Sequence, residues 1–410
     1  MDEGSAAVPP WLTIVGIGED GLAGLGDEAK RRIASAEIVF GGARHLLLAE
    51  PLIAGERHAW LSPFERSVAA VIAARGRTAV VLASGDPFLH GVGATLSRRI
   101  DPSEILTLPA PSAFSLAASR LGWQLQEVAT VSLHGRPDDL IRPNLQPGAR
   151  ILALTSDGAG PAALSALLTR TGFGGSALIV LEALGGPQER ITRARADTLP
   201  PIAFHALNLC AVEVAAGADA RVLPLASGRD DGLFEHDGQI TKREVRAVTL
   251  STLAPRRGEL LWDIGAGSGS IAVEWLLADP AMRAVAVEQA PERAARIARN
   301  ASAFGVPGLV VVEGRAPDVL AGLEAPDAVF IGGGGSVPGV MSAILAALKP
   351  GGRVVANAVT VEMEAVLLDH HARLGGSLIR IDIARAAPVG GMTGWRPAMP
   401  VTQWSWTRGL

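Results

Sequence analysis

The chain has 410 residues, enough for two or three domains that each bury a core of their own. Hydrophobic residues make up 48% of it, and no apolar run approaches the ~18 residues of a membrane span, which favours a soluble globular protein without a membrane partner. A net charge of −4 without a long basic run argues against nucleic acid as the main partner. The single cysteine, Cys210, excludes a disulfide framework and a cysteine-rich metal site.

The first residues, 1–10, are interpreted as a leader. They begin with acidic residues where a secretory signal would be basic, and no apolar signal core follows. We therefore expect a cytoplasmic protein.

The N-terminal half, 11–216, alternates strands with helices and predicts an α/β domain. The first strand ends in a formal Gly-x-Gly-x-x-Gly at Gly16, Gly18 and Gly21, but the next helix begins only near Asp27, so we reject a dinucleotide site there.

Two further loops in this half follow predicted strands. Gly85-Asp86-Pro87 follows the strand at 78–83, and Pro111-Ser112-Ala113 opens a helix at Ser112, a good N-cap. Taken alone, Gly85-Asp86-Pro87 is better explained as a turn, because these residue types are common in turns.

Together and in this order, the three loops resemble those of the tetrapyrrole methylase superfamily. The resemblance implies two α/β subdomains with S-adenosyl-L-methionine (SAM) held in the cleft between them. It places Gly85, Asp86, Ser112 and Ala113 against SAM. The chain has Glu19-Asp20 where the family often has Pro-Gly, which leaves the role of the first loop open.

A change of composition at 217–233, where Gly, Pro, Ser and Asp crowd together, predicts a linker between two domains. After it, Thr241 and Glu244 have the spacing of a capping box at the start of a helix. Capping alone explains both residues. Because this helix directly precedes the next buried strand, Thr241 is also expected to face a ligand cleft. The second domain is predicted to span 234–410.

The stretch 260–271 combines a buried strand, a glycine turn at Gly265, Gly267 and Gly269, and a helix start at Ser270. The following strand, 284–287, ends in Glu288, whose carboxylate can accept two hydrogen bonds from a ribose diol. This order predicts a nucleoside-binding half-domain and disfavours a ligand-free glycine turn.

The spacing of the glycines decides between nucleosides. A dinucleotide fingerprint needs a third glycine where the chain has Ser270, which disfavours a dehydrogenase. Asp263 with the loop Gly265–Gly269 resembles motif I of the Rossmann-like SAM methyltransferases. That resemblance places Ala266 and Ser268, together with the three glycines and Glu288, against SAM.

The alternation continues with a third strand at 309–312, a fourth at 328–331 and a fifth at 353–356. Ala316, after the third strand, stands where a residue of this class of fold flanks the adenine ring. The fourth strand ends in Gly332–Gly335 instead of the Asp/Asn-Pro-Pro-Tyr of amino-directed DNA methyltransferases. The tail, 378–406, suits an antiparallel end of the sheet.

The second half resembles the small methyltransferases that act on precorrin intermediates in cobalamin biosynthesis, through 241–246, the four glycines and 390–395. A tetrapyrrole methylase fused ahead of it is the layout of a bifunctional, decarboxylating family. The resemblance implies two methyl transfers to the meso carbons C5 and C15 of a precorrin and the loss of CO₂ from a ring acetate. It also implies one SAM per domain.

Placing a sulfonium methyl group in line with an enamine-like carbon asks little of catalytic side chains, and no catalytic residue is assigned. The conjugated ring can take the electrons that CO₂ leaves behind, so no metal is expected.

A polycarboxylate substrate needs cations at the mouth of the cleft. Lys242, Arg243 and Arg246 are the candidates, and a solvated helix face explains them equally well. The main rival function is an RNA methyltransferase, which would require a basic stripe and an aromatic stacking surface, and neither is visible. A binding module with decayed catalysis is disfavoured by the intact glycine loops. We expect a homo-oligomer.

Overall fold

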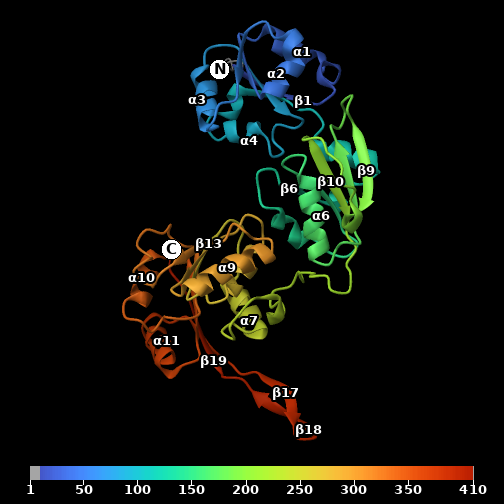
Figure 1. The fold of residues 1–410 in the computed structure, drawn as a ribbon. Coiled ribbons are helices and arrows are strands. Elements are labelled where there is room, and N and C mark those ends of the chain that lie inside the picture. Colours follow the sequence, from blue (N-terminus) through green and yellow to red (C-terminus); the bar gives the residue numbers. More distant parts are fainter. Residues whose placement is uncertain (1–9, 410) are drawn as a thin grey trace, which may run out of the picture. The chain divides into compact units, whose positions relative to one another are not determined.

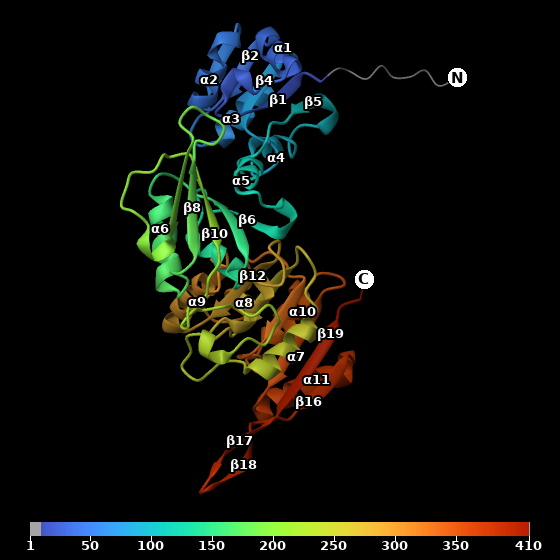
Figure 2. The ribbon, with the colours of Figure 1, turned by 90° about the vertical axis from the view of Figure 1, so that its right-hand side faces the viewer.

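A computed structural model describes residues 10–409, so the predicted leader lies almost wholly outside the described residues. The chain forms two compact units. Unit 1 comprises the residues up to Asp138 together with Gln146–Ala220, and unit 2 comprises Asp139–Leu145 and the residues from Arg221 onward. Within the described residues, no helix is long and apolar enough to cross a membrane. Figure 1 and Figure 2 show the elements of each unit.

Unit 1 begins with a parallel five-stranded sheet in the order β3-β2-β4-β1-β5. The strands are β1 (Leu12–Ile17), β2 (Ile38–Gly41), β3 (Glu56–Ala59), β4 (Ala79–Ser84) and β5 (Ile105–Leu108). The helices among them are α1 (Asp27–Ser35), α2 (Ala43–Ala49), α3 (Glu65–Ala73) and α4 (Val92–Leu96).

Side chains alternate across this sheet, so each central strand serves two cores. On β1, Leu12 and Ile14 join the core beneath α3, whereas Val15 and Ile17 join the core beneath α1 and α2. Burial on both faces explains why these strands read as continuous apolar runs.

A second five-stranded sheet completes unit 1 in the order β6-β7-β10-β8-β9, with only β6 and β7 parallel. Its strands are β6 (Val128–Ser132), β7 (Arg150–Leu154), β8 (Ala177–Glu182), β9 (Arg190–Arg195) and β10 (Asn208–Glu213). Helix α5 (Ala113–Leu121) packs on it through Phe114 and Ala117, and α6 (Gly160–Arg170) follows β7. The two sheets are the two α/β subdomains that the sequence predicts.

Unit 2 is built on a seven-stranded sheet in the order β13-β12-β11-β14-β15-β19-β16. The first five strands are parallel, and β19 is antiparallel to both of its neighbours. The strands are β11 (Leu260–Ile264), β12 (Arg283–Glu288), β13 (Val310–Glu313), β14 (Ala328–Ile331), β15 (Arg353–Ala358), β16 (Ser377–Ile381) and β19 (Val401–Thr407).

Helices cover both faces of this sheet. They are α7 (Arg243–Leu253), α8 (Ser270–Leu276) and α9 (Pro291–Ala303) on one face, and α10 (Val340–Ala347) and α11 (Val361–Leu374) on the other. Leu261 on β11 points toward α7–α9, while Trp262, fully buried, points toward α10 and α11. Each such large apolar side chain stabilises the unit by about 1.5–3 kcal/mol. The Rossmann-like fold predicted for this half is confirmed.

The tail differs from the prediction in part. Strands β16 and β19 do complete the sheet in antiparallel fashion, but β17 (Ala384–Val389) and β18 (Met392–Pro397) pair only with each other. Both views show this hairpin projecting from the body of unit 2 (Figures 1 and 2).

Candidate functional site

The loop after β11 has a backbone that only glycine adopts easily. Gly265, Gly267 and Gly269 have φ angles of +66°, +60° and +73°. A Cβ on Gly265 would stand 2.7 Å from the carbonyl oxygen of Gly333, so the glycine loop and the loop after β14 approach each other through bare backbone. Helix α8 then begins at Ser270.

Glu288 lies at the carboxyl end of β12, the strand next to β11. Its side chain is buried, and its Oε2 accepts a hydrogen bond from Gly267 N at 2.9 Å. Oε1 accepts from Ala290 N at 3.0 Å. Each carboxylate oxygen can accept a second hydrogen bond, so Glu288 is held in place and still available to a diol.

A cavity of about 780 Å³ opens in front of these loops in unit 2. Most of the predicted binding residues line it, namely Thr241, Lys242, Gly265, Ala266, Gly267, Glu288 and Ala316. Ser268 and Gly269 do not. Ser268 is buried and its carbonyl accepts from Asn300 Nδ2 at 2.8 Å, while Gly269 faces Ile297. These two residues shape the loop from behind.

Asp263 also lines the cavity, although it was not among the predicted binding residues. It is the penultimate residue of β11, fully buried, with Oδ2 accepting from Ala272 N at 3.1 Å. Oδ1 is buried without a partner among the described residues. Burial raises the pKa of Asp263 to about 7. A carboxylate near the end of a buried strand, just before a glycine turn, is the signal that would have identified it.

The other wall of the cavity is largely apolar. It is formed by residues near the base of the β17–β18 hairpin and after β15, namely Val359, Ile381, Ile383, Ala398 and Met399. Arg385 of β17 also lines the cavity and pairs with Glu244 of α7. Arg315 lines it too, and no ion pair is found for Arg315 within residues 10–409.

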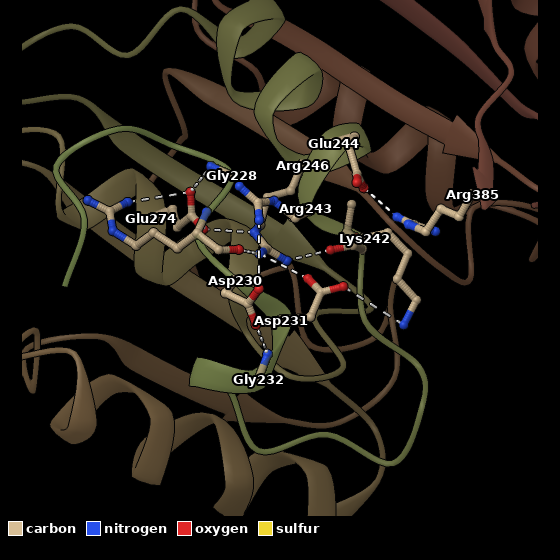
Figure 3. A network of polar contacts seen from close by, with 12 residues as sticks. Gly228, Asp230, Asp231, Gly232, Lys242, Arg243, Glu244, Arg246, Glu274 and Arg385 are labelled. Atoms are coloured by element: carbon tan, nitrogen blue, oxygen red, sulfur yellow. Dashed lines mark hydrogen bonds and ion pairs between the residues drawn. The ribbon is translucent and has the colours of Figure 1, made fainter. Parts of the chain in front are cut away.

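The three predicted cations have three different positions (Figure 3). Lys242 lines the cavity and is half exposed. Arg243 is not part of the lining and lies 3.7 Å from Asp230. Arg246 is completely buried and pairs with Glu274 at 2.8 Å, so it is not a cation at the cleft mouth. A charge with a buried partner is committed to the fold and cannot turn toward a substrate.

The predicted capping box is wrong. The N-cap of α7 is Lys242, without a side-chain cap, and Thr241 stands one residue before it. The carbonyl of Thr241 accepts from Arg246 Nη1 at 2.5 Å, and Glu244 reaches Arg385 instead of the helix N-terminus. Arg246 thereby holds Thr241 at the cavity wall without a capping bond.

Unit 1 contains a second cavity, of about 800 Å³, and all four predicted residues, Gly85, Asp86, Ser112 and Ala113, line it. Gly85 has φ +52°, and a Cβ there would stand 2.8 Å from the carbonyl oxygen of Pro111. Ser112 is the N-cap of α5, as predicted, and its Oγ accepts from Ser115 N at 3.1 Å. Asp86 Oδ1 accepts from Phe88 N at 2.8 Å, so this residue also forms the turn that was its alternative explanation.

A polar cluster in the same cavity was not predicted. His45 Nε2 lies 2.9 Å from Ser84 Oγ and 2.7 Å from Arg44 Nη2, and Arg44 pairs with Glu19. Burial and the neighbouring Arg44 lower the pKa of His45 to about 4, which keeps the ring neutral. No group of three or more His, Cys, Asp or Glu side chains that could hold a metal ion occurs within the described part of the chain.

Two family models match the chain, one in each half. The model described as tetrapyrrole (corrin/porphyrin) methylases matches residues 11–200, and the model described as a precorrin methyltransferase domain matches 232–408.

Two relatives match nearly the whole chain, and both are named precorrin-6Y C(5,15)-methyltransferase [decarboxylating]. The protein of a Sinorhizobium species is 70% identical over 98% of both chains. That of Mycobacterium tuberculosis CDC 1551 is 42% identical over 97% of this chain and 100% of its own. A third relative, from Salmonella typhimurium, is named cobalt-precorrin-6B C(15)-methyltransferase (decarboxylating). It is 31% identical over 40% of this chain and 85% of its own.

Proposed function

The chain belongs to the precorrin-6Y C5,15-methyltransferase (decarboxylating) family, and from this premise we propose that its two units each bind one SAM and divide two methyl transfers between them. The acceptor is a precorrin of cobalamin biosynthesis, methylated at C5 and C15 and decarboxylated at a ring acetate. Nothing in the comparisons supports RNA as the substrate. The observation that carries the proposal is that each unit contains a cavity of about 800 Å³ lined by its own glycine-rich loop.

The donor side of the unit 2 cavity fits SAM, which supplies a methyl group already activated on a sulfonium sulfur. Glu288 has free acceptor positions for the ribose diol, and the bare backbone of Gly265 and Gly267 admits a ligand at close range. The unpartnered Oδ1 of Asp263 suits the ammonium group of the methionine moiety. Ala316 is placed to lie beside the adenine ring.

The acceptor side of the same cavity suits a large ring that carries carboxylates. Apolar residues such as Ile381 and Met399 cover one wall, and Lys242, Arg315 and Arg385 supply positive charge around it. Arginine and lysine bind carboxylates by charge-assisted hydrogen bonds. When the cavity holds donor and acceptor in line at near-attack distance, the barrier to methyl transfer falls by as much as about 7 kcal/mol or more.

In unit 1, we propose that Gly85, Asp86, Ser112 and Ala113 contact the second SAM. Gly85 lets the chain turn away from the ligand, and Ser112 orients the start of α5 toward the cavity. Arg44, which lines the cavity beside neutral His45 and pairs with Glu19, is a candidate for a substrate carboxylate.

For the division of labour, we propose that unit 2 methylates C15 and decarboxylates, while unit 1 methylates C5. The Salmonella relative aligns with only 40% of this chain and is named for C15 methylation and decarboxylation alone. Unit 2 resembles the small precorrin methyltransferases, which supports its assignment to that relative's two steps. The functional boundary is proposed to lie near residue 220, where unit 1 ends.

We also propose a cytoplasmic homo-oligomer without a nucleic-acid partner. An isolated two-stranded hairpin is marginally stable in water, yet the β17–β18 hairpin exposes 81% of Met392 and 77% of Trp395. A second copy of the chain is the proposed cover. Light scattering on the protein and on Trp395→Glu should give a multiple of the chain mass for the first and a smaller species for the second.

Product analysis tests the division of labour. With SAM and the precorrin, the chain should yield a product that has gained two methyl groups and lost CO₂, as mass spectrometry would detect. Glu288→Ala should leave a product methylated once and still carrying its acetate. Asp86→Ala should leave one methylated once and decarboxylated. If both variants lose both methylations equally while remaining folded, the two units do not act separately.

A further inference from the structure

A short segment, residues 238–242, runs along the unit 2 cavity, and we call it the strap. All five of its residues line the cavity. The strap also meets the glycine loop, because a Cβ on Gly267 would stand 3.5 Å from the carbonyl oxygen of Gln239. The position of the strap therefore sets the width of the donor side of the cavity.

One end of the strap is held by Arg246, whose side chain is completely buried (Figure 3). Its Nη1 donates to the carbonyl of Thr241 at 2.5 Å, and its Nη2 donates to the carbonyl of Arg229 at 2.5 Å. Nη2 also lies 3.1 Å from Asp231 Oδ1, and the guanidinium stands 4.8 Å from the ring centre of Phe234. One side chain thus ties the strap to residues 229–231 of unit 2.

Glu274 is the buried counter-charge of Arg246. Its Oε1 accepts from Arg246 Nε at 2.8 Å, and its two oxygens accept from Gly228 N at 2.7 Å and Arg229 N at 3.0 Å. Glu274 lies on α8, the helix that follows the glycine loop directly. A buried ion pair contributes little net stability, but a fully hydrogen-bonded one fixes geometry. Here it fixes the strap relative to the glycine loop.

The other end of the strap is held by Asp237. Its Oδ2 pairs with Arg293 Nε at 2.9 Å and with Arg296 Nη1 at 3.1 Å, both on α9, and its Oδ1 accepts from Gln239 N at 3.1 Å. The hydrogen bond from Arg296, and after it the one from Arg293, holds the pKa of Asp237 far below its ordinary value. The carboxylate of Asp237, which anchors this end of the strap, therefore stays charged.

We propose that Arg246 and Asp237 are positioning residues that hold the strap against the glycine loop, so that the SAM site of unit 2 is preformed. This inference rests on the proposed function, in which the unit 2 cavity binds SAM. Neither residue touches the reacting atoms. A preformed wall removes the ordering cost that a loose segment would add to each binding event.

Two variants release one anchor each. Arg246→Met with Glu274→Gln removes both charges of the pair and keeps one oxygen, which can accept from either Gly228 N or Arg229 N. The double change also removes the ion-pair partner of the Arg229 guanidinium, 3.4 Å away. Asp237→Asn loosens the partly exposed anchor and does not depend on the buried network. Glu324→Gln, which breaks the exposed pair with Arg283 away from the cavity, is the matched control.

The test is calorimetric titration of the full chain with SAM, in which the unit 1 site serves as the internal reference. We expect the Kd of the unit 2 site to rise on the order of tenfold in both anchor variants and to stay unchanged in the control. In steady state, KM for SAM should rise while kcat at saturating SAM is retained. Hydrogen exchange should show faster exchange of the strap amides.

The outcomes separate the two ideas. If the unmodified chain binds SAM in unit 1 only, the proposed function of unit 2 fails. If it binds in both units and the variants keep the original Kd, or lose kcat in step with folded protein at constant KM, Arg246 and Asp237 serve stability alone and the inference is overturned. Should the double variant not fold, Asp237→Asn decides.

Discussion

The carboxylate of Glu288 and the backbone N–H of Gly267 lie 2.9 Å apart and form a hydrogen bond between the end of β12 and the glycine loop. Since Gly267 belongs to the turn after β11, this contact joins two neighbouring strand ends in the wall of the cavity. Glu288 therefore has two proposed roles. It binds the ribose of the ligand, and it holds in place the glycine loop that contacts other parts of the ligand.

Replacing Glu288 with Ala should weaken SAM binding in unit 2 by about 10- to 100-fold. The change removes a charged acceptor from the ribose diol and from Gly267 N, and hydrogen bonds to a charged group contribute about 1.5–3 kcal/mol. Calorimetry measures the effect. The site in unit 1 should keep its affinity, and an equal loss at both sites would contradict separate binding.

Two variants distinguish the role of Asp86 in forming the turn from its proposed role in binding SAM. Asp86→Asn keeps an oxygen that can accept from Phe88 N but removes the charge, whereas Asp86→Ala removes both. If Asp86 contacts SAM as a carboxylate, both variants should weaken the unit 1 site, Asn by about fivefold and Ala by more. An Asn variant that binds SAM like the original would show that Asp86 only forms the turn.

Asp263 should make the stability of unit 2 depend on pH. Burial raises its pKa to about 7 in the folded state, whereas the pKa of an aspartate in the unfolded chain is about 3.9. Between these values the folded chain binds more protons than the unfolded chain, so the free energy of unfolding falls as pH rises from about 4 to about 7.

Asp263→Asn removes this titration and keeps an acceptor for Ala272 N. Relative to the original chain, the variant should gain stability across that window, up to about 4 kcal/mol near neutral pH. Urea unfolding at a series of pH values measures it. Parallel pH profiles for the two proteins would mean that Asp263 does not titrate in this range.

Two glycines of the same loop should respond differently to alanine. Both have positive φ, which costs roughly 1–2 kcal/mol for an alanine. At Gly265 the new Cβ would also meet the backbone of Gly333, whereas at Gly267 its nearest neighbour is 3.5 Å away. Gly265→Ala should therefore destabilise unit 2 by about 3 kcal/mol or more, clearly beyond Gly267→Ala, in chemical denaturation. Equal losses would show that the loop after β14 can move aside.

Much of the fold was predictable because parallel strands buried on both faces appear in the sequence as continuous apolar runs. The run Leu260–Ile264 is apolar except for Asp263, and the strand, the glycine turn and the helix start follow it as predicted. The strand ending in Glu288 was predicted for the same reason. Neighbouring residues along the chain determine these elements, so the sequence pattern was sufficient to predict them.

Contacts between distant residues were not predictable in the same way. Thr241 and Glu244 have capping spacing, but Glu244 pairs with Arg385, 141 residues away, and the helix begins one residue later. Arg246 was predicted to lie at the mouth of the cleft, with a solvated helix face as the alternative, because arginine is rarely fully buried unless it is paired. One signal was available: Glu274 interrupts an otherwise apolar helix, and a carboxylate there requires a buried cation.

The tail shows a further limit. Within 378–406, apolar and polar residues alternate strictly only over short runs such as Ile379–Ile383, and this period fits a strand of the large sheet as well as a free hairpin. Trp404 is fully buried in β19, whereas Trp395 is 77% exposed in β18. The pairing partner, which the sequence does not state, decides between the two environments.

Strand β19 lies between β15 and β16, although it comes last of the three along the chain. A polypeptide interrupted between residues 382 and 400 would thus leave β15 with an open edge and β16 with nothing to pair with. Such an edge is a template for aggregation. A frameshift late in the coding region should consequently yield an insoluble product instead of a slightly shortened enzyme.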